Sequence, residues 1–220
     1  MQAPAPSRIG RLHVVTDTDL QARFSHADLA RLAARGGSDT IQFRYKNGPM
    51  RVRWAALEPT ADACRAAGVA LVVDDHVDLA LAIGAGVHLG QTDLPVAVAR
   101  RLLGPAATVG ATATSADAAR AAEAAGASYV GFGPVFATAS KANPDPVTGL
   151  AVLAEACAAV RIPVVAIGGI TVERVAAVLG VGAWGVAVLS AVVCAADVEA
   201  AAAAFREAID AAVRPDGVAT

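Results

Sequence analysis

Two aspartates stand just beyond short apolar runs, and their types and spacing suggest a site for a hard cation. Asp75 follows the run that ends in Val73-Asp74, and Asp93 ends the segment His88-Leu-Gly-Gln-Thr-Asp93. Mg2+ prefers octahedral oxygen coordination and is commonly held by one or two carboxylates together with substrate phosphates and water. The pair is therefore predicted to bind magnesium. The alternative is that each aspartate only caps the helix that follows it.

An alternating polar segment precedes this pair. Gln42, Arg44 and Lys46 are separated by single residues, so on an extended chain their side chains would point the same way. One amide and two cations on one face of an apolar element predict a contact with an anion. The alternative is a solvated strand end whose cations form salt bridges.

A third group of residues is suited to phosphate. Gly168-Gly169 follows an apolar run, and glycines let the backbone approach a ligand while the next helix N-terminus offers free N–H groups. Ser190 follows a later apolar run, and the segment 133–141 adds the hydroxyls of Thr138 and Ser140 and the cation of Lys141. Together these residues predict a binding site for a diphosphate or phosphate substrate.

Short β-branched runs alternate with Ala-rich stretches along the chain, and this alternation must position the site. The predicted strands are 12–16, 40–43, 70–73, 87–89, 108–110, 129–132, 164–167 and 185–189. The predicted helices are about 26–35, 51–67, 76–83, 94–103, 115–125, 149–160, 172–180 and 197–213. Such repetition predicts an α/β fold with a single parallel (β/α)8 TIM barrel. A doubly wound open sheet is the alternative, but the first strand is followed by Thr16-Asp-Thr-Asp19 instead of a Gly-x-Gly-x-x-Gly turn.

In such a barrel, functional residues gather where the strands end at the C-terminal face. The polar residues fall just after predicted strands, which is the strongest signal in the chain: Gln42, Arg44, Lys46, Asp74, Asp75, Asp93, Thr112, Lys141, Gly168, Gly169 and Ser190. The segment 139–149, with two prolines, is a candidate active-site lid.

Composition bounds the class of protein. The 220 residues, 55% of them hydrophobic, fit one domain over 1–220, with 1–10 as a flexible N-terminal extension. A net charge of −2 without a long basic run argues against nucleic acid as a partner. The three cysteines lack metal-site spacing, and we expect no disulfide framework. Signal-peptide features are absent from the sequence and the apolar stretches are short, so we expect a cytoplasmic protein without membrane spans.

The motifs that carry the site resemble those of the thiamine-phosphate synthases, in order and spacing, from Leu12 to the last helix. They are Gln42-Phe-Arg-Tyr-Lys46, Asp75-His76, His88-Leu-Gly-Gln-Thr-Asp93, Tyr129-Val-Gly-Phe-Gly-Pro134, Thr138-Ala-Ser-Lys141 and Ile167-Gly-Gly-Ile170. The resemblance implies a TIM barrel that joins a pyrimidine methyl diphosphate to a thiazole phosphate and releases pyrophosphate. It also implies Mg2+ as cofactor, and a homodimer or monomer as family-level possibilities.

The resemblance assigns roles to residues of this chain. Asp75 and Asp93 would bind magnesium, and Arg44, Lys46 and Lys141 would be the catalytic cations. The residues implied in substrate binding are Gln42, Phe43, Arg44, Tyr45, Lys46, Asp74, Thr112 and Lys141 for the pyrimidine diphosphate, and Thr138, Ala139, Ser140, Gly169, Leu189 and Ser190 for the thiazole phosphate.

This chain departs from the family pattern at a few positions. Asp74 stands where the family usually has Asn, and a third carboxylate there would repel a diphosphate unless it joins the metal or meets a cation. Ala137 replaces a common Pro, Thr112 a common Ser, and Thr114 stands where many relatives have His.

Three alternative functions remain open at this point. A related thiazole tautomerase would share the barrel, but Asp93 and the absence of a His at position 114 favour the synthase. Another phosphate-handling isomerase would explain Gly168-Gly169 without the aspartate pair. A third alternative is a catalytically degenerate paralogue that binds thiamine phosphates, and Asp74 is the single feature that supports it.

Overall fold

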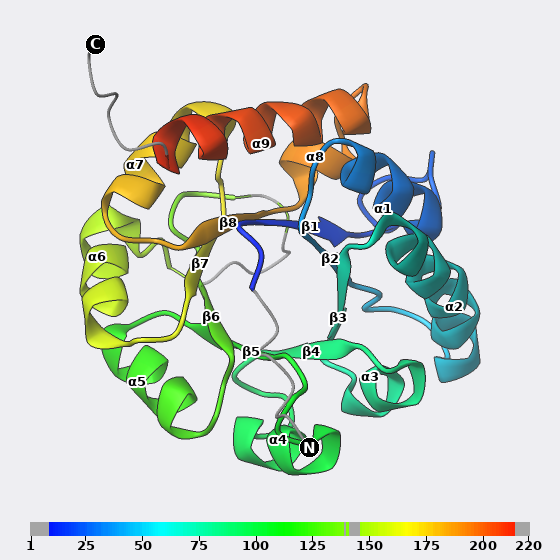
Figure 1. Ribbon diagram of the computed structural model, residues 1–220, viewed down its shortest axis with the longest axis horizontal. Coiled ribbons are helices and arrows are strands. Elements are labelled where there is room, and N and C mark those ends of the chain that lie inside the picture. Colours follow the sequence, from blue (N-terminus) through cyan, green and yellow to red (C-terminus); the bar gives the residue numbers. More distant parts are fainter. Residues whose placement is uncertain (1–8, 139, 141–145, 214–220) are drawn as a thin grey trace.

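The strands form a closed, all-parallel barrel in a computed structural model that describes residues 9–138, 140 and 146–213. Each strand pairs with the next in the sequence, and β1 pairs with β8 through His13–Ala187 and its neighbours, which closes the barrel (Figure 1). The strands are β1 Leu12–Thr16, β2 Thr40–Phe43, β3 Ala70–Asp74, β4 Gly86–Leu89, β5 Val109–Ala113, β6 Tyr129–Phe132, β7 Val164–Ile167 and β8 Gly185–Val188. The predicted TIM barrel is confirmed, and the open sheet is excluded.

Helices surround the barrel, as Figure 1 shows. They are α1 His26–Arg35, α2 Met50–Ala67, α3 Val77–Ile83, α4 Val96–Leu103, α5 Ala116–Ala124, α6 Gly149–Ala159, the 3-10 helix η1 Val172–Arg174, α7 Val175–Gly180, α8 Ser190–Val193 and α9 Val198–Val213. The predicted helix 172–180 is divided into η1 and α7, and α8 was not predicted. A predicted strand end was also wrong, since β5 continues to Ala113 and places Thr112 inside the strand.

Local sequence signals explain where several helices begin and end. Ser25 caps α1 with a complete capping box: its hydroxyl accepts from the Asp28 N–H, and the Asp28 carboxylate accepts from the Ser25 N–H. The Ser115 hydroxyl accepts from the Ala118 N–H at the start of α5. Gly68 ends α2 in the left-handed conformation, with φ of 69°.

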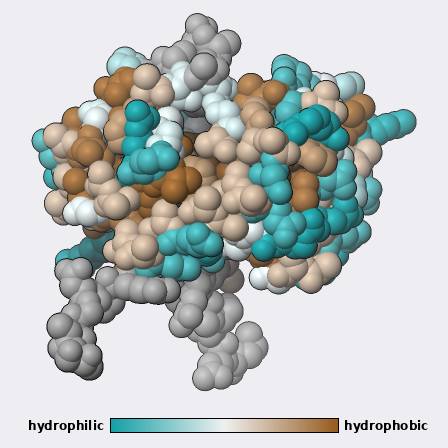
Figure 2. All heavy atoms as spheres, turned by 90° about the horizontal axis from the view of Figure 1, so that it is seen from above, coloured by the Kyte–Doolittle hydropathy of each residue, from teal (hydrophilic) through white to brown (hydrophobic). Residues whose placement is uncertain are grey.

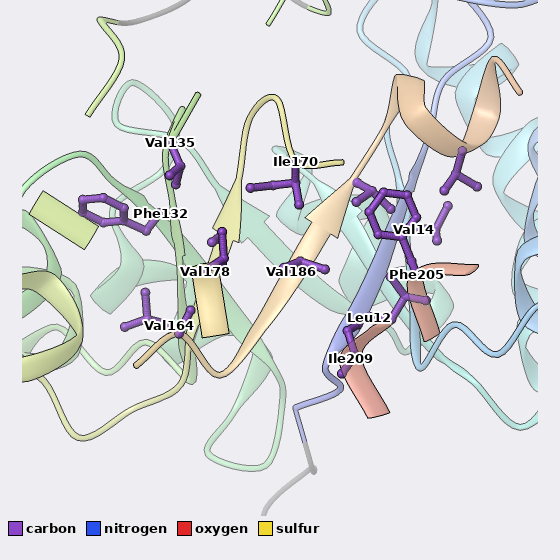
Figure 3. Packing of buried hydrophobic residues seen from close by; sticks show 14 of the residues in the cluster. Leu12, Val14, Phe132, Val135, Val164, Ile170, Val178, Val186, Phe205 and Ile209 are labelled. Carbon is purple, nitrogen blue, oxygen red and sulfur yellow. The ribbon is translucent and has the colours of Figure 1, made fainter. Parts of the chain in front are cut away.

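The largest apolar cluster lies between the strands and the outer helices. Phe205 and Ile209 of α9 pack beside Leu12 of β1, with Val186 of β8 nearby (Figure 3). All four side chains are at most 2% exposed. Their burial ties the last helix to the strands that close the barrel, because apolar area removed from water is the main favourable term in folding.

The N-terminal end of the barrel is covered by residues just before β1. Trp184 Nε1 donates to the Ile9 carbonyl at 2.9 Å, and the Arg11 guanidinium lies 3.9 Å from the Trp184 ring centroid. Ile9 also packs against the inner cluster of Tyr129, Val165 and Ala187. Within the predicted extension 1–10, Ile9 and Gly10 are therefore held against the barrel, while residues 1–8 lie outside the described part.

Hydrophilic and hydrophobic residues are interspersed on the face shown in Figure 2. Over the described residues, no helix combines the length and the apolar character needed to cross a membrane.

Candidate active site

A cavity of about 520 Å3 opens among the C-terminal ends of the strands. It brings together most of the residues singled out from the sequence, which come from separate strand–helix units. Its lining includes Gln42, Arg44, Lys46, Asp74, Asp75, Asp93, Thr112, Thr138, Ser140, Gly169, Leu189 and Ser190. The predicted gathering of these residues at one end of the barrel is thus confirmed, while their assigned roles stay predictions.

Asp74 at the end of β3 lies among groups that compensate its charge. Gln42 Nε2 donates to Asp74 Oδ1 at 2.8 Å, and Lys46 Nζ lies 2.8 Å from Asp74 Oδ2. Arg44 Nε is 3.9 Å from the same oxygen. The carboxylate is only 9% exposed, so these contacts supply the partners that a buried charge requires. The expected repulsion by a third carboxylate is therefore offset by two cations.

Lys46 joins Asp74 to Asp75. Its ammonium is 2.5 Å from Asp75 Oδ2 as well as close to Asp74. Burial alone would lower the pKa of Lys46, but the two carboxylates outweigh it and raise that pKa above its usual value. Burial would raise the pKa of Asp75, but Lys46 lowers it. Both groups are consequently held in their charged forms.

Neither predicted metal ligand acts as the helix cap that was its alternative. The N-cap of α3 is His76 and that of α4 is Pro95, and neither makes a side-chain capping bond. Asp75 instead has φ of 64°, which is uncommon for a residue other than glycine, and its N–H donates to the His88 carbonyl at 2.8 Å. Asp93 Oδ2 accepts from the Gly90 N–H at 2.6 Å. Each carboxylate is thus held by its loop so that it lines the cavity.

The donor set of Asp75 and Asp93 fits a divalent cation. Both carboxyl groups line the cavity, and burial together with the negative charge of Asp75 raises the pKa of Asp93. Neighbouring carboxylates repel unless a cation or a proton lies between them. No cluster of three or more His, Cys, Asp or Glu side chains suited to a metal occurs in the described ranges. A site with two carboxylates is what Mg2+ uses when a substrate phosphate completes its coordination.

A second group of cavity residues is neutral and rich in hydroxyls. Ser140 Oγ and Ser190 Oγ are 2.9 Å apart, and Thr138 Oγ1 lies 3.2 Å from Ser140 Oγ. Gly169 beside them has φ of 62°, and a Cβ there would lie 2.4 Å from the Ala137 carbonyl oxygen. Only glycine fits this close approach without a shift of the backbone. Hydroxyl donors beside a glycine turn are groups suited to an anion, and here they line the same cavity as the charged group.

The cavity lining also includes His88, which belongs to the motif that ends in Asp93, together with His13 and Tyr129, whose place the sequence did not reveal. His88 Nδ1 and Nε2 lie 3.0 Å from Tyr129 Oη and from Thr112 Oγ1, respectively. His13 also lines the cavity and packs edge-on against Tyr129, with ring centroids 5.3 Å apart. A Cβ on Gly131 would lie 2.7 Å from His88 Cε1. The glycine there makes room for His88, which is a long-range relation that spacing along the chain does not predict.

Some predicted site residues lie elsewhere or outside the described part. Phe43 is 2% exposed in the core, where its ring centroid is 4.5 Å from that of His26, and Tyr45 packs against the same cluster. Neither lines the cavity that Gln42, Arg44 and Lys46 line. Ala139 and Lys141 lie outside the described residues, as does most of the predicted lid, so their assigned roles stay predictions.

Comparison with known proteins agrees with this geometry. A family model described as thiamine monophosphate synthase matches residues 12–192. A thiamine-phosphate synthase of Salinibacter ruber is 54% identical over 213 residues, covering 96% of this chain and 94% of the relative. One of Methanoculleus marisnigri is 50% identical over 202 residues, covering 91% and 96%. The structure of a thiamine phosphate pyrophosphorylase from Pyrococcus furiosus is similar with a TM-score of 0.83 and 38% identity, covering 92% of this chain and 96% of that one. This chain belongs to the thiamine monophosphate synthase family.

Proposed function

We propose that this chain is a thiamine-phosphate synthase that joins a pyrimidine methyl diphosphate to a thiazole phosphate and releases pyrophosphate. The observation that carries the proposal is that one cavity is lined both by a charged group and by a group of hydroxyls, each suited to an anion site. Arg44, Lys46 and the Asp75–Asp93 pair line one site, while Ser140 and Ser190 line the other. Two phosphorylated substrates could thus be held side by side, and the names of the relatives support the same reaction.

The charged site suits the departure of a diphosphate. Arg44 and Lys46 line it, and their positive charges would stabilise the negative charge that develops on the leaving group. Mg2+ held by Asp75 and Asp93 would supply further neutralisation of that charge. The positive charge left on the pyrimidine methylene carbon is delocalised into the aminopyrimidine ring.

The hydroxyl site suits the second substrate. Ser140, Ser190 and the Gly169 turn would bind the thiazole phosphate and orient the ring so that its nitrogen attacks the methylene carbon. That nitrogen carries no proton, so the step needs no general base. Catalysis would then rest on positioning and electrostatics. This agrees with a cavity that is lined largely by charged groups and by hydroxyls suited to binding phosphate.

Asp74 is compatible with this role. Its carboxylate accepts from Gln42 and pairs with Lys46, both of which line the cavity. Because a carboxylate only accepts hydrogen bonds, the Gln42 amide must turn its nitrogen toward Asp74. Asp74 therefore orders Gln42 and Lys46, and these contacts support an active enzyme over a degenerate binding protein.

The proposal is tested by following thiamine phosphate formation with and without Mg2+ in the wild-type protein, Asp93→Ala and Asp74→Asn. We expect magnesium-dependent product from the wild type, its loss in Asp93→Ala, and retained turnover in Asp74→Asn. Absence of product from the wild type at every magnesium concentration would refute the proposed reaction. Turnover that appears only in Asp74→Asn would instead mean that the natural residue disables the site.

A further inference from the structure

Asp17, in the loop after β1, is a buried carboxylate whose contacts lead to the charged site. It is 2% exposed. Its Oδ2 forms an ion pair with Nη1 of Arg44, and the Arg44 side chain is 17% exposed. Its Oδ1 accepts from the N–H groups of Asp19 at 2.8 Å and Leu20 at 3.2 Å. The two oxygens therefore have different tasks: one orders the loop, and the other binds Arg44.

The position of Asp17 is behind Arg44 as seen from the cavity. Arg44 and Asp74 belong to the described lining of the cavity, and Asp17 does not. Arg44 Nε lies 3.9 Å from Asp74 Oδ2, so the guanidinium lies between one carboxylate at the cavity and one away from it. Asp17 need not contact a ligand in the cavity to influence its binding, because it can act through Arg44.

We propose that Asp17 is a positioning residue that fixes the Arg44 guanidinium for recognition of the diphosphate substrate. This inference rests on the proposed function. A long arginine side chain loses rotamer entropy when it is ordered, and the ion pair with Asp17 orders it before any ligand binds. The planar guanidinium carries five N–H donors, so a bond from Nη1 to Asp17 still leaves donors that can face an anion.

The loop that carries Asp17 is itself tied to the segment that carries Arg44. The Arg44 N–H donates to the Thr16 carbonyl at 3.2 Å. Asn47 Nδ2 donates to Asp19 Oδ2 at 2.8 Å. These contacts hold the loop of Asp17 against the segment of Arg44. A change at Asp17 should therefore alter the geometry of Arg44 more than the path of the backbone.

Asp17→Asn tests the inference, because Asn keeps an oxygen for the Asp19 and Leu20 N–H groups but replaces the charged acceptor of Arg44 with an NH2 group, which cannot accept a hydrogen bond. We expect the KM for the pyrimidine diphosphate to rise roughly tenfold to a hundredfold, as for other residues that orient a binding group. The KM for the thiazole phosphate should stay within about twofold, since its site does not include Arg44. Asp17→Ser, whose hydroxyl can also accept a loop N–H, should give the same selective effect.

Two controls separate positioning from a loss of structure. Asp39→Asn is the matched variant at the other end of the barrel, where Asp39 Oδ2 likewise accepts from the N–H groups of Arg11 and Leu12 and pairs with Arg206. It should leave both KM values unchanged. In an Arg44→Ala background, Asp17→Asn should have no further effect on kcat/KM, because residues that act through one contact are not additive.

The outcomes are distinct. Failure of the wild type to form product would count against the proposed function and not against Asp17 in particular. With an active wild type, the inference would be overturned by an unchanged KM in Asp17→Asn, by equal increases for both substrates, or by a full additional effect in the Arg44→Ala background. Unfolding of both Asp17 variants would overturn it as well, since Asp17 would then be required for folding itself.

Discussion

The two ends of the barrel differ in how their charged residues are arranged. At the N-terminal end, Asp39 accepts from two backbone N–H groups and pairs with Arg206, which also pairs with Asp210 at 2.6 Å. At the C-terminal end, Asp75 lies beside the like charge of Asp93 and has a backbone φ of 64°. Both ends therefore contain ion pairs, since Lys46 pairs with Asp74 and Asp75, but the C-terminal end also places two like charges, Asp75 and Asp93, together at a cavity.

This difference explains which end carries function. In TIM barrels, residues at the N-terminal face generally serve stability, and those at the C-terminal ends of the strands serve chemistry. Crowding of carboxylates costs free energy unless a cation joins them, so such a cluster indicates a ligand. We therefore expect changes at the two ends to separate into losses of activity and losses of stability.

The largest expected effect is at the C-terminal end. Asp93→Ala should lower kcat/KM by roughly 10²–10³-fold, because it removes one of the two carboxylates that would hold Mg2+ near the developing charge. Its free energy of unfolding should change by less than about 1 kcal/mol, because the lost bond from Gly90 and the relieved repulsion with Asp75 oppose each other. Steady-state rates and urea unfolding measure the two quantities. Retained magnesium-dependent activity would contradict the assignment of Asp93.

The next effect concerns the barrel interior between the two ends. Burial, opposed by the Gly10 carbonyl, lowers the pKa of His13 from 6.5 to about 4. The folded state therefore favours neutral His13, and the stability that this provides is complete above pH 6.5 and is lost as the pH falls toward 4. The loss should be on the order of 3 kcal/mol. Urea unfolding between pH 7 and 4 should show a shallower pH dependence in His13→Gln than in the wild type. Equal slopes would mean that His13 is not held neutral.

A smaller effect is expected at the N-terminal end. Asp39→Asn should lower the free energy of unfolding by about 1–2 kcal/mol, because it weakens charge-assisted hydrogen bonds from Arg11, Leu12 and Arg206. Its kcat/KM should equal that of the wild type. A selective loss of turnover without a loss of stability would break the proposed division between the two ends.

The smallest effect belongs to the hydroxyl pocket. Ser190→Ala removes one hydroxyl near Ser140, and a single neutral hydrogen bond is worth about 1 kcal/mol. The KM for the thiazole phosphate should rise about fivefold, and that for the pyrimidine diphosphate should stay constant. A change in the second KM alone would show that the two anion sites have been assigned to the wrong substrates.

Much of the barrel could be predicted because most strands contain a short β-branched run between Ala-rich helices. The errors fall where local pattern and tertiary structure differ. Strand β5 continues through Ala111-Thr112-Ala113, which has little β-branched character but pairs with β6. The short helix α8 begins at Ser190, where the pattern indicated only the end of a strand.

The site was predictable to the extent that its residues follow strands. Asp75 and Asp93 could be placed at the cavity because each comes just after an apolar run, and barrel geometry brings such positions together. Asp17 and Tyr129 could not, because their roles depend on Arg44 and His88, which are distant in the sequence. The spacing of residues along the chain does not show which distant side chains contact each other in the fold.

The most direct test of the account measures activity and stability in the same three proteins: wild type, Asp93→Ala and Asp39→Asn. Magnesium-dependent thiamine phosphate formation and the free energy of unfolding would be determined for each. We predict that Asp93→Ala loses activity and keeps its stability, whereas Asp39→Asn keeps activity and loses stability. Parallel losses of both quantities in either variant would contradict the claim that the two ends of this barrel are built for different purposes.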